Sequence, residues 1–173
     1  MNKMKTELIR CYCESGRCEC CRLTQAVKQM PNGIEDNVMA VMTEVVAPTA
    51  RAYGKGIEIV KGFSCPVFNK NEKVKDIKAQ DHVKGEAVDL KAVGLEGRDL
   101  RFENVEIAKV IVQTVEFDEL VLEDVPADGI EPKSLHVSYR KGGKNRKVVL
   151  KHVSGKAVCE ELSRLDMEQL MSE

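Results

Sequence analysis

Aromatic residues are scarce in this chain of 173 residues. Only 4% are Phe, Tyr or Trp, and none is Trp, so the sequence offers no aromatic platform on which a sugar ring or a base stacks. An excess of one charge is lacking too: 27 Lys and Arg stand against 28 Asp and Glu, which gives no reason to expect a nucleic-acid partner. The remaining composition, 43% hydrophobic and 32% charged, is typical of an ordinary soluble globular protein.

Long apolar runs are also absent. No segment approaches the roughly 20 apolar residues that a helix needs to cross a bilayer, so we expect no membrane partner. The first ten residues, "MNKMKTELIR", lack the apolar region of a secretory signal. We therefore expect synthesis and folding in the cytoplasm, where thiols are kept reduced.

Cysteine is concentrated near the N-terminus. Five of the seven cysteines lie in "CYCESGRCECC": Cys11, Cys13, Cys18, Cys20 and Cys21. Thiolates spaced C-x-C-x4-C-x-C can wrap a second, structural metal, because four sulfurs suit tetrahedral binding. A reduced arm, or a disulfide formed outside the cell, is the alternative. We interpret residues 1–23 as a Cys-rich N-terminal arm and residues 24–173 as a single domain that includes a C-terminal helix.

Hydrophobic periodicity predicts helices first and most strands later. Helices are expected in three segments: 35–54, 103–115 and 156–173. Strands are expected in five alternating segments: 56–62, 86–90, 117–124, 134–140 and 146–153. Pro48 should kink or split the first helix, and Val158, Leu162 and Leu165 should form the apolar stripe of the last one. The order predicts an α+β fold with a small antiparallel sheet flanked by helices.

Two strand residues with side chains that can bind a metal are expected on the same face of this sheet. Asp89 alternates with apolar residues in "EAVDL", and His136 does so in "SLHVSYR", so both should turn away from the core. His82 reaches the same side by way of the turn at Lys84 and Gly85. Two imidazoles and a carboxylate are a donor set that binds catalytic zinc and leaves a fourth position for water. A purely structural role for the three residues is the alternative.

Four segments occur in an order that resembles a known family: "IEIVKGFSCPVFNK", "AQDHVKGEAVDL", "FDELVLED" and "LHVSYR". Together they resemble the zinc D-Ala-D-Ala carboxypeptidase family, with the Hedgehog/DD-peptidase fold, and more closely its phage-type branch of peptidoglycan peptidases. The likeness spans roughly residues 30–150 and depends most on the H-x6-D motif with Gly and Ala inside it. It implies that His82, Asp89 and His136 hold zinc and that the chain hydrolyses amide bonds of peptidoglycan stem peptides.

The resemblance also indicates substrate-binding positions at Ser64 and Asn69. Relatives carry an Arg at the position of Ser64, where it supports substrate or transition-state charge, and a Ser at the position of Lys61. Lys61 offers another cation, but three residues away on a strand we expect it to emerge on the other face.

A catalytic carboxylate is needed as well, because several relatives place one three residues before the last His, where this chain has Lys133. Glu123 aligns with the Glu that closes the family's F-D-Q-L-I-x-E motif, so it is the first candidate for the catalytic base. Glu131 is the second candidate, and Glu119 shares a strand face with Glu123.

The leading hypothesis is therefore a zinc metallopeptidase, either a D-Ala-D-Ala carboxypeptidase or an endolysin-like endopeptidase, released to the cell wall by a phage or associated with a virion. Ser64 and Lys133 favour an alternative: a zinc-binding module of the same fold that has lost catalysis and serves wall binding or virion structure. A metal- or redox-responsive Cys arm is a third hypothesis. The remaining histidine, His152, is expected to be exposed at a strand end.

Overall fold

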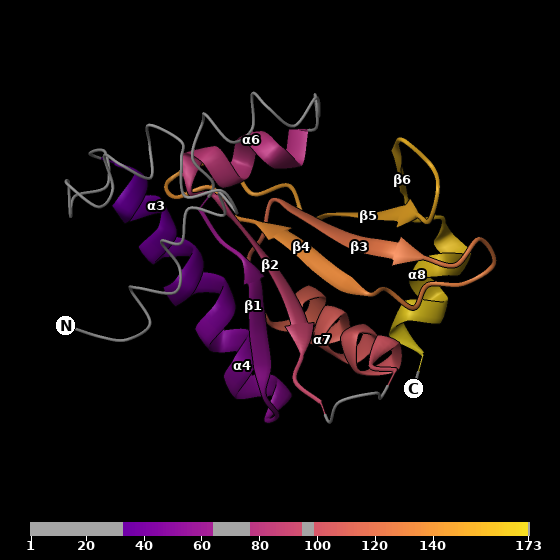
Figure 1. Ribbon diagram of the computed structural model, residues 1–173. Coiled ribbons are helices and arrows are strands. Elements are labelled where there is room, and N and C mark those ends of the chain that lie inside the picture. Colours follow the sequence, from indigo (N-terminus) through magenta and orange to yellow (C-terminus); the bar gives the residue numbers. More distant parts are fainter. Residues whose placement is uncertain (1–32, 64–76, 95–98, 173) are drawn as a thin grey trace, which may run out of the picture.

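A six-stranded mixed sheet with helices packed around it forms the computed structural model, an α+β fold (Figure 1). The structure describes residues 33–63, 77–94 and 99–172. The Cys-rich arm and the two predicted substrate-binding residues, Ser64 and Asn69, lie outside these ranges. None of the described helices is long and apolar enough to span a bilayer.

The first helical region confirms the predicted helix and its interruption. Helix α3 (Ile34–Val41) runs into a π-helical turn, η1 (Met42–Val46), and then into α4 (Ala47–Tyr53). Pro48 lies in the first turn of α4, where it cannot donate the backbone hydrogen bond that an α-helix requires at that position. The wider turn immediately before it accommodates this missing donor.

The sheet contains one strand more than the sequence predicts. The strands are β1 (Ile57–Lys61), β2 (Ala87–Ala92), β3 (Glu119–Val125), β4 (Ser134–Ser138), β5 (Val148–Val153) and β6 (Cys159–Glu161). Their order is β1-β2-β4-β3-β5-β6, and every pair is antiparallel except β3 and β5. Because β2 occupies the other edge of β4, β5 pairs with β3 instead. The chain reverses direction between β4 and β5, and β4 is antiparallel to β3, so β5 runs parallel to β3. The expectation of an antiparallel sheet is wrong for this pair.

The predicted C-terminal helix begins later than expected. Residues Cys159–Glu161 form β6 on the edge of β5, and only Arg164–Met171 form helix α8. Ser163 caps α8: its hydroxyl accepts from the Asp166 N–H, and the Asp166 carboxylate accepts from the Ser163 N–H, a capping box that fixes the helix start. Of the predicted apolar stripe only Leu162 is buried, whereas Val158 and Leu165 are exposed.

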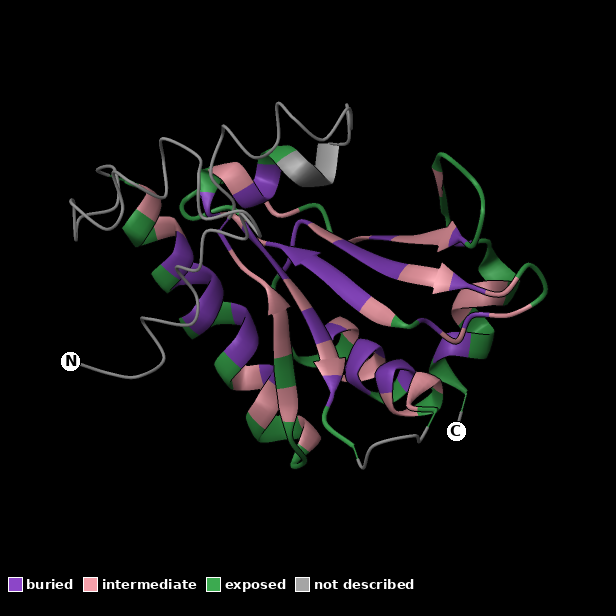
Figure 2. Cartoon of the chain, viewed as in Figure 1, coloured by how far each residue is buried: buried purple, intermediate pink, exposed green. Residues whose placement is uncertain are grey.

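The core lies between the sheet and helix α7 (Arg101–Thr114), which contacts β2, β4, α4 and α8. Buried residues follow β2, β4 and the sheet-facing sides of the helices (Figure 2). The innermost side chains are Val88, Leu90, Ile107, Ile111, Leu120, Leu135 and Val137. Helix α6 (Ile77–Lys84) lies on the other side of the sheet from α7 (Figure 1). Residues that alternate with the core positions of β2 and β4 therefore face the side of α6.

A buried side chain on α7 holds both strands that carry these residues. The Asn104 carbonyl accepts from the Ala92 N–H at 2.7 Å, and its amide donates to the backbone oxygens of Pro132 and Lys133 at 3.0 and 2.8 Å. These bonds tie the end of β2 and the start of β4 to one point on the helix. A fully satisfied buried amide of this kind fixes geometry at little net cost.

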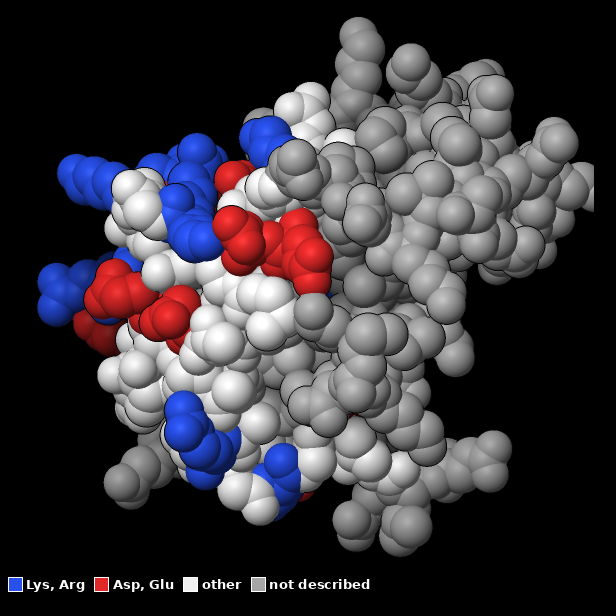
Figure 3. Space-filling view, turned by 90° about the vertical axis from the view of Figure 1, so that its left-hand side faces the viewer, with Lys and Arg blue, Asp and Glu red and all other residues white. Residues whose placement is uncertain are grey.

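A charged cluster closes one end of the sheet. The Asp118 carboxylate is buried and accepts from Arg146 and Arg140, with Nε contacts of 2.8 Å each. The hydrogen bonds from Arg146 and Arg140 outweigh the effect of burial and hold the pKa of Asp118 below its usual value. Arg146 also pairs with Glu119. Elsewhere, on the face that carries α3 and α4, described side chains of both signs lie interspersed (Figure 3).

Candidate metal centre

Three side chains from separate elements meet on the α6 side of the sheet. Asp89 on β2 lies directly opposite His136 on β4 in the strand register, as the alternation predicts, and His82 comes from α6. The Asp89 Oδ1 atom lies 2.9 Å from His136 Nδ1 and 3.1 Å from His82 Nε2. The two imidazole rings meet edge to face, with centroids 4.9 Å apart. The predicted grouping of these three residues is confirmed.

The group is largely shielded from water but opens at Asp89. The side chains of His82 and His136 are 2% and 1% exposed, and that of Asp89 is 21% exposed. Burial by itself would raise the pKa of Asp89, but hydrogen bonds and charges from His136 and His82 outweigh it and hold the pKa well below the usual value. Asp89 is therefore an anion at neutral pH.

The hydrogen bonding of His82 leaves a place for a proton or a metal ion in the group. His82 Nδ1 lies 2.8 Å from the Gly62 carbonyl oxygen, and because a carbonyl only accepts, Nδ1 carries the hydrogen. In the neutral imidazole Nε2 then has a lone pair, which faces the Asp89 Oδ1 atom at 3.1 Å. Two acceptors repel at this distance unless a proton or a metal ion lies between them.

The donor atoms also suit a metal by their spacing and type. One ligand atom from each of His82, Asp89 and His136 lies within 4.8 Å of the others, and imidazole nitrogens with a carboxylate oxygen suit divalent transition metals. The Gly62 carbonyl plays the part of the outer hydrogen-bond acceptor that orients metal-binding histidines. We conclude that this group can hold a metal ion.

Gly85 sets the position of His82 relative to Asp89, since it forms the turn between α6 and β2. Its φ is +71°, and a Cβ atom there would lie 2.8 Å from Val38 Cγ2 and 3.0 Å from the Ile34 carbonyl oxygen. The turn therefore requires a glycine for its backbone conformation and for its close approach to α3. This explains why the motif needs glycine at this position.

We expect Gly85→Ala to destabilise the protein more than Gly54→Ala does. Gly54 has a nearly equal φ of +72° but no atom within 4 Å of the added Cβ, so its substitution should cost only the left-handed backbone strain of about 1–2 kcal/mol. At Gly85 overpacking adds about 1–3 kcal/mol. Urea unfolding of both variants measures the difference, and equal losses would show that contact with α3 is unimportant.

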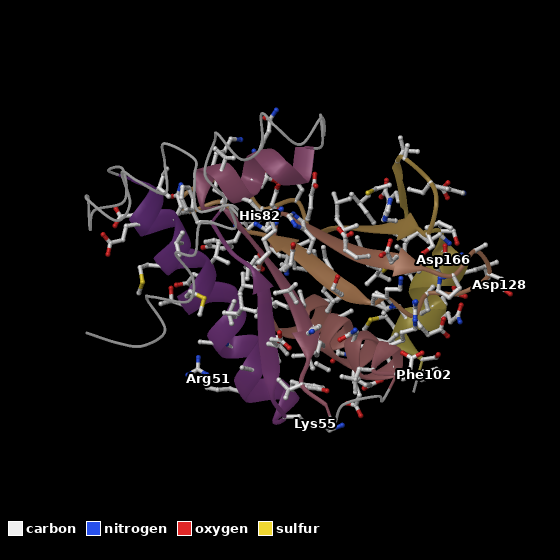
Figure 4. All side chains as sticks on the ribbon, viewed as in Figure 1. Arg51, Lys55, His82, Phe102, Asp128 and Asp166 are labelled. Atoms are coloured by element: carbon white, nitrogen blue, oxygen red, sulfur yellow. The ribbon has the colours of Figure 1, made fainter. Side chains whose placement is uncertain are left out.

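The two predicted catalytic carboxylates lie in different surroundings. Glu123 is paired with Ser134 across β3 and β4, while His136 is paired with Val121, so Glu123 lies one diagonal step from His136 on the same face. Its Oε2 atom is 4.0 Å from His152 Nδ1. Glu131 instead accepts from the Ile130 N–H at 3.2 Å in the loop after β3. The tip of this loop, at Asp128, lies at the far end of the sheet from His82 (Figure 4).

Two further carboxylates lie near the group: Glu119, which already forms an ion pair, and Asp81, for which the sequence predicted no role. Glu119 shares the face of Glu123 but is paired with Arg146. Asp81, next to His82 on α6, is only 4% exposed. Burial raises the pKa of Asp81, and the charges of His136 and Lys84 offset this only in part. In the sequence, only the position of Asp81 directly before His82 indicates that it lies near the group.

A β-bulge on β1 decides which face of the sheet Lys61 occupies. Ile59 pairs with Leu90, but two residues later Lys61 pairs with Asp89, so a β-bulge at Val60 shifts the register. The extra residue reverses the alternation, and Lys61 therefore lies directly beside Asp89 on the same face. Whether Lys61 and Ser64 lie on opposite faces, as the sequence predicts, stays a prediction, because Ser64 lies outside the described residues.

The third histidine and the cysteines lie apart from this group. His152 on β5 is partly buried, not at an exposed strand end: its side chain is 24% exposed and its Nε2 lies 2.8 Å from the Lys156 carbonyl oxygen. The predicted thiolate cluster lies outside the described residues, and Cys159 on β6 is a free thiol.

Comparison of the whole chain with protein-family models, with curated proteins and with solved structures gave no match in any of the three.

Proposed function

We propose that this chain is a zinc-dependent peptidase of Hedgehog/DD-peptidase-like fold that hydrolyses amide bonds in peptidoglycan stem peptides. The observation that carries the proposal is the approach of His82 Nε2 and His136 Nδ1 to the same Asp89 Oδ1 atom, at 3.1 and 2.9 Å, with His82 Nδ1 held by the Gly62 carbonyl. A proton or a divalent cation would stabilise this buried arrangement.

Zinc fits the three donors by number, type and spacing. Catalytic zinc sites have three protein ligands and one open position, and two histidines with a carboxylate are a known set. Ligands about 2.0–2.1 Å from a tetrahedral zinc lie about 3.3 Å from one another. The contacts of Asp89 Oδ1 with His82 and His136 are 3.1 and 2.9 Å, so small side-chain shifts suffice for binding.

The chain's own residues supply positioning and proton transfer. A zinc ion held there would polarise a peptide carbonyl and make water acidic enough to attack it near neutral pH. The Gly62 carbonyl fixes the ring of His82, and Asp89 remains anionic between the two imidazoles. Glu123, on the same face and one diagonal step from His136, takes the proton of the attacking water at its carboxylate and delivers it to the leaving amine.

The substrate class comes from the motifs. The H-x6-D segment with its internal Gly and Ala, followed by "FDELVLED" and "LHVSYR", resembles phage-type peptidoglycan peptidases. Peptides of the bacterial wall with D-amino acids are therefore the proposed substrates, and we propose that the protein reaches them by phage release or as a virion component. Each of these statements is open to direct test.

The test is digestion of purified muropeptides by the full chain, followed by mass spectrometry. We expect loss of a terminal D-Ala or cleavage within the stem peptide, abolished by EDTA and restored by added zinc. Intact muropeptides after incubation with protein that holds zinc would contradict the enzymatic proposal.

One observation favours a second candidate, a zinc-binding module without activity that binds cell wall or serves as a virion part. Lys133 occupies the position where several relatives carry the catalytic carboxylate, and its ammonium lies 3.7 Å from Asp124. An inactive module would retain zinc and bind muropeptides without cleaving them, so the same digestion decides between the two candidates.

A further inference from the structure

The second ring nitrogen of His136, Nε2, is buried and lies without a hydrogen-bond partner among the residues that the structure describes. We propose that the Asp81 carboxylate is a positioning residue of the metal centre, which accepts the hydrogen of His136 Nε2 when a metal is bound at Nδ1. This inference rests on the metal centre of the proposed function but not on the peptidase reaction, because it concerns how a ligand is held.

The need for an acceptor follows from the tautomer of His136. Its Nδ1 atom lies 2.9 Å from Asp89 Oδ1, and since an ionised carboxylate only accepts, the hydrogen of the metal-free ring lies on Nδ1. Nδ1 is also the nitrogen that faces Asp89, so it is the one that can share a metal with it. A metal binds the lone pair of an imidazole nitrogen, which requires the hydrogen on Nε2 instead. A buried N–H is costly unless it is hydrogen-bonded.

Asp81 is a buried carboxylate on the helix that covers this ring. It directly precedes His82 on α6, and the two residues are 4% and 2% exposed, so both side chains lie between α6 and the sheet, where Figure 4 shows His82. The ring of His82 in turn contacts that of His136. The backbone joins the same elements: the Asp81 carbonyl accepts from the Glu86 N–H at 2.9 Å, and the Glu86 carbonyl accepts from the Tyr139 N–H at 2.8 Å.

The Asp81 carboxylate lies close to His136, on the side away from Asp89. Burial raises the pKa of Asp81, and among the charges that oppose this rise His136 acts most strongly, ahead of Lys84, whose Nζ is 3.8 Å from Asp81 Oδ1. Glu119, on β3, also acts on Asp81. Strand β4 lies between β2 and β3, so a ring whose Nδ1 faces Asp89 on β2 directs Nε2 away from β2, toward the side where Asp81 lies.

The Asp81 carboxylate is not committed to another group in the described part of the chain. Its one cation within ion-pairing distance there is Lys84, at 3.8 Å, and the Lys84 side chain is 52% exposed. This distance is too long for a hydrogen bond. Histidines that bind a metal almost always donate from their other nitrogen to a carboxylate, a backbone carbonyl or water, and Asp81 is the buried carboxylate placed to accept from His136.

The first test measures zinc affinity by competition with a chromogenic chelator, which needs no catalysis. Asp81→Leu removes the acceptor at similar volume and should weaken zinc binding about 10- to 100-fold, as loss of an outer hydrogen-bond partner does. Asp81→Asn should lose less, because its amide oxygen still accepts. Glu86→Leu, which removes the same charge beside the turn, should stay within a few-fold of wild type because exposed charges are screened by salt. Zinc bound by Asp89→Ala is subtracted throughout.

The second test reads the Nε2 hydrogen directly, which a merely structural role of Asp81 would not change. In zinc-loaded wild type, nitrogen–proton NMR of the imidazoles should show a slowly exchanging His136 Nε2–H. In Asp81→Leu this signal should exchange rapidly, while His82 Nδ1–H, held by the Gly62 carbonyl, stays protected. Asp81→Val, which also lacks an acceptor, takes its place if Asp81→Leu does not fold.

Wild-type zinc affinity and a protected Nε2–H in the Asp81 variants would overturn the role of Asp81, as would an equal loss of affinity in Glu86→Leu. Wild type that binds no more zinc than Asp89→Ala would overturn the metal centre and this role together. If zinc binding weakens as expected in Asp81→Leu but zinc-loaded wild type leaves muropeptides intact, the peptidase proposal fails while the role of Asp81 stands.

Discussion

Replacing Asp89 by Ala is expected to abolish the binding of one zinc ion per chain, and His82→Ala should do the same. Removing Asp89 leaves two buried imidazoles, His82 and His136, without the anion that both contact. Substituting residues that merely support a metal ligand costs about 10- to 100-fold in affinity, so loss of a ligand itself should exceed that. Elemental analysis of dialysed protein, compared with wild type, gives the zinc content.

His152→Ala is the matched control for this experiment, since it removes the same type of side chain from β5, which β3 separates from β4, without touching the triad. It should retain the wild-type zinc content. Taking the difference from wild type cancels any metal bound by the Cys-rich arm. Full zinc content in Asp89→Ala, with circular dichroism showing a folded protein, would contradict the proposed metal centre.

The part of the fold that could be predicted from sequence is the part governed by regular alternation. The strand residues Asp89 and His136 each sit between buried apolar neighbours, and the period of two places both on one face wherever the strands are regular. Their direct pairing across β2 and β4 confirms this reasoning. The first long helix was likewise predicted from its apolar spacing and from the interruption at Pro48.

What could not be predicted depends on pairing between distant segments. The sequence of the three residues of β6 does not by itself indicate a strand. They form one because they pair with the free edge of β5. The parallel pairing of β3 and β5 follows from which edge of β4 is already occupied, which no local pattern records. The prediction of the last helix relied on the apolar stripe at Val158, Leu162 and Leu165, whereas the capping box that starts α8 involves Ser163 and Asp166.

In the candidate site, too, some residues could be predicted from the sequence and others could not. The three residues that could hold a metal lie in the H-x6-D and "LHVSYR" motifs, so the alternation of the strands and the resemblance of these motifs were enough to group them. The position of Lys61 could not be predicted, because a single extra residue at Val60 turns its side chain to the opposite face, and bulges leave no reliable trace in the sequence. The role of the Gly62 carbonyl was also hidden, since any residue offers a carbonyl and only the fold shows where it points.

Replacing Glu123 by Gln should lower kcat/KM on muropeptides by about 100- to 10,000-fold, the usual worth of a positioned catalytic base, while zinc content stays at the wild-type level. Gln keeps the shape and hydrogen-bonding length of the side chain but cannot take a proton, so a folded, metal-loaded and inactive protein is the expected result. Steady-state kinetics with parallel elemental analysis measures both quantities.

Glu119→Gln makes the comparison specific, because Glu119 lies on the same strand and the same face as Glu123, on the other side of Val121, but is paired with Arg146. Its carboxylate is committed to the cluster around Asp118, whose two arginines already bind a buried anion. We therefore expect Glu119→Gln to retain activity within a few-fold of wild type. If the two variants lose activity equally, proton transfer cannot be assigned to Glu123, and Asp81, the buried carboxylate next to His82, becomes the next residue to substitute.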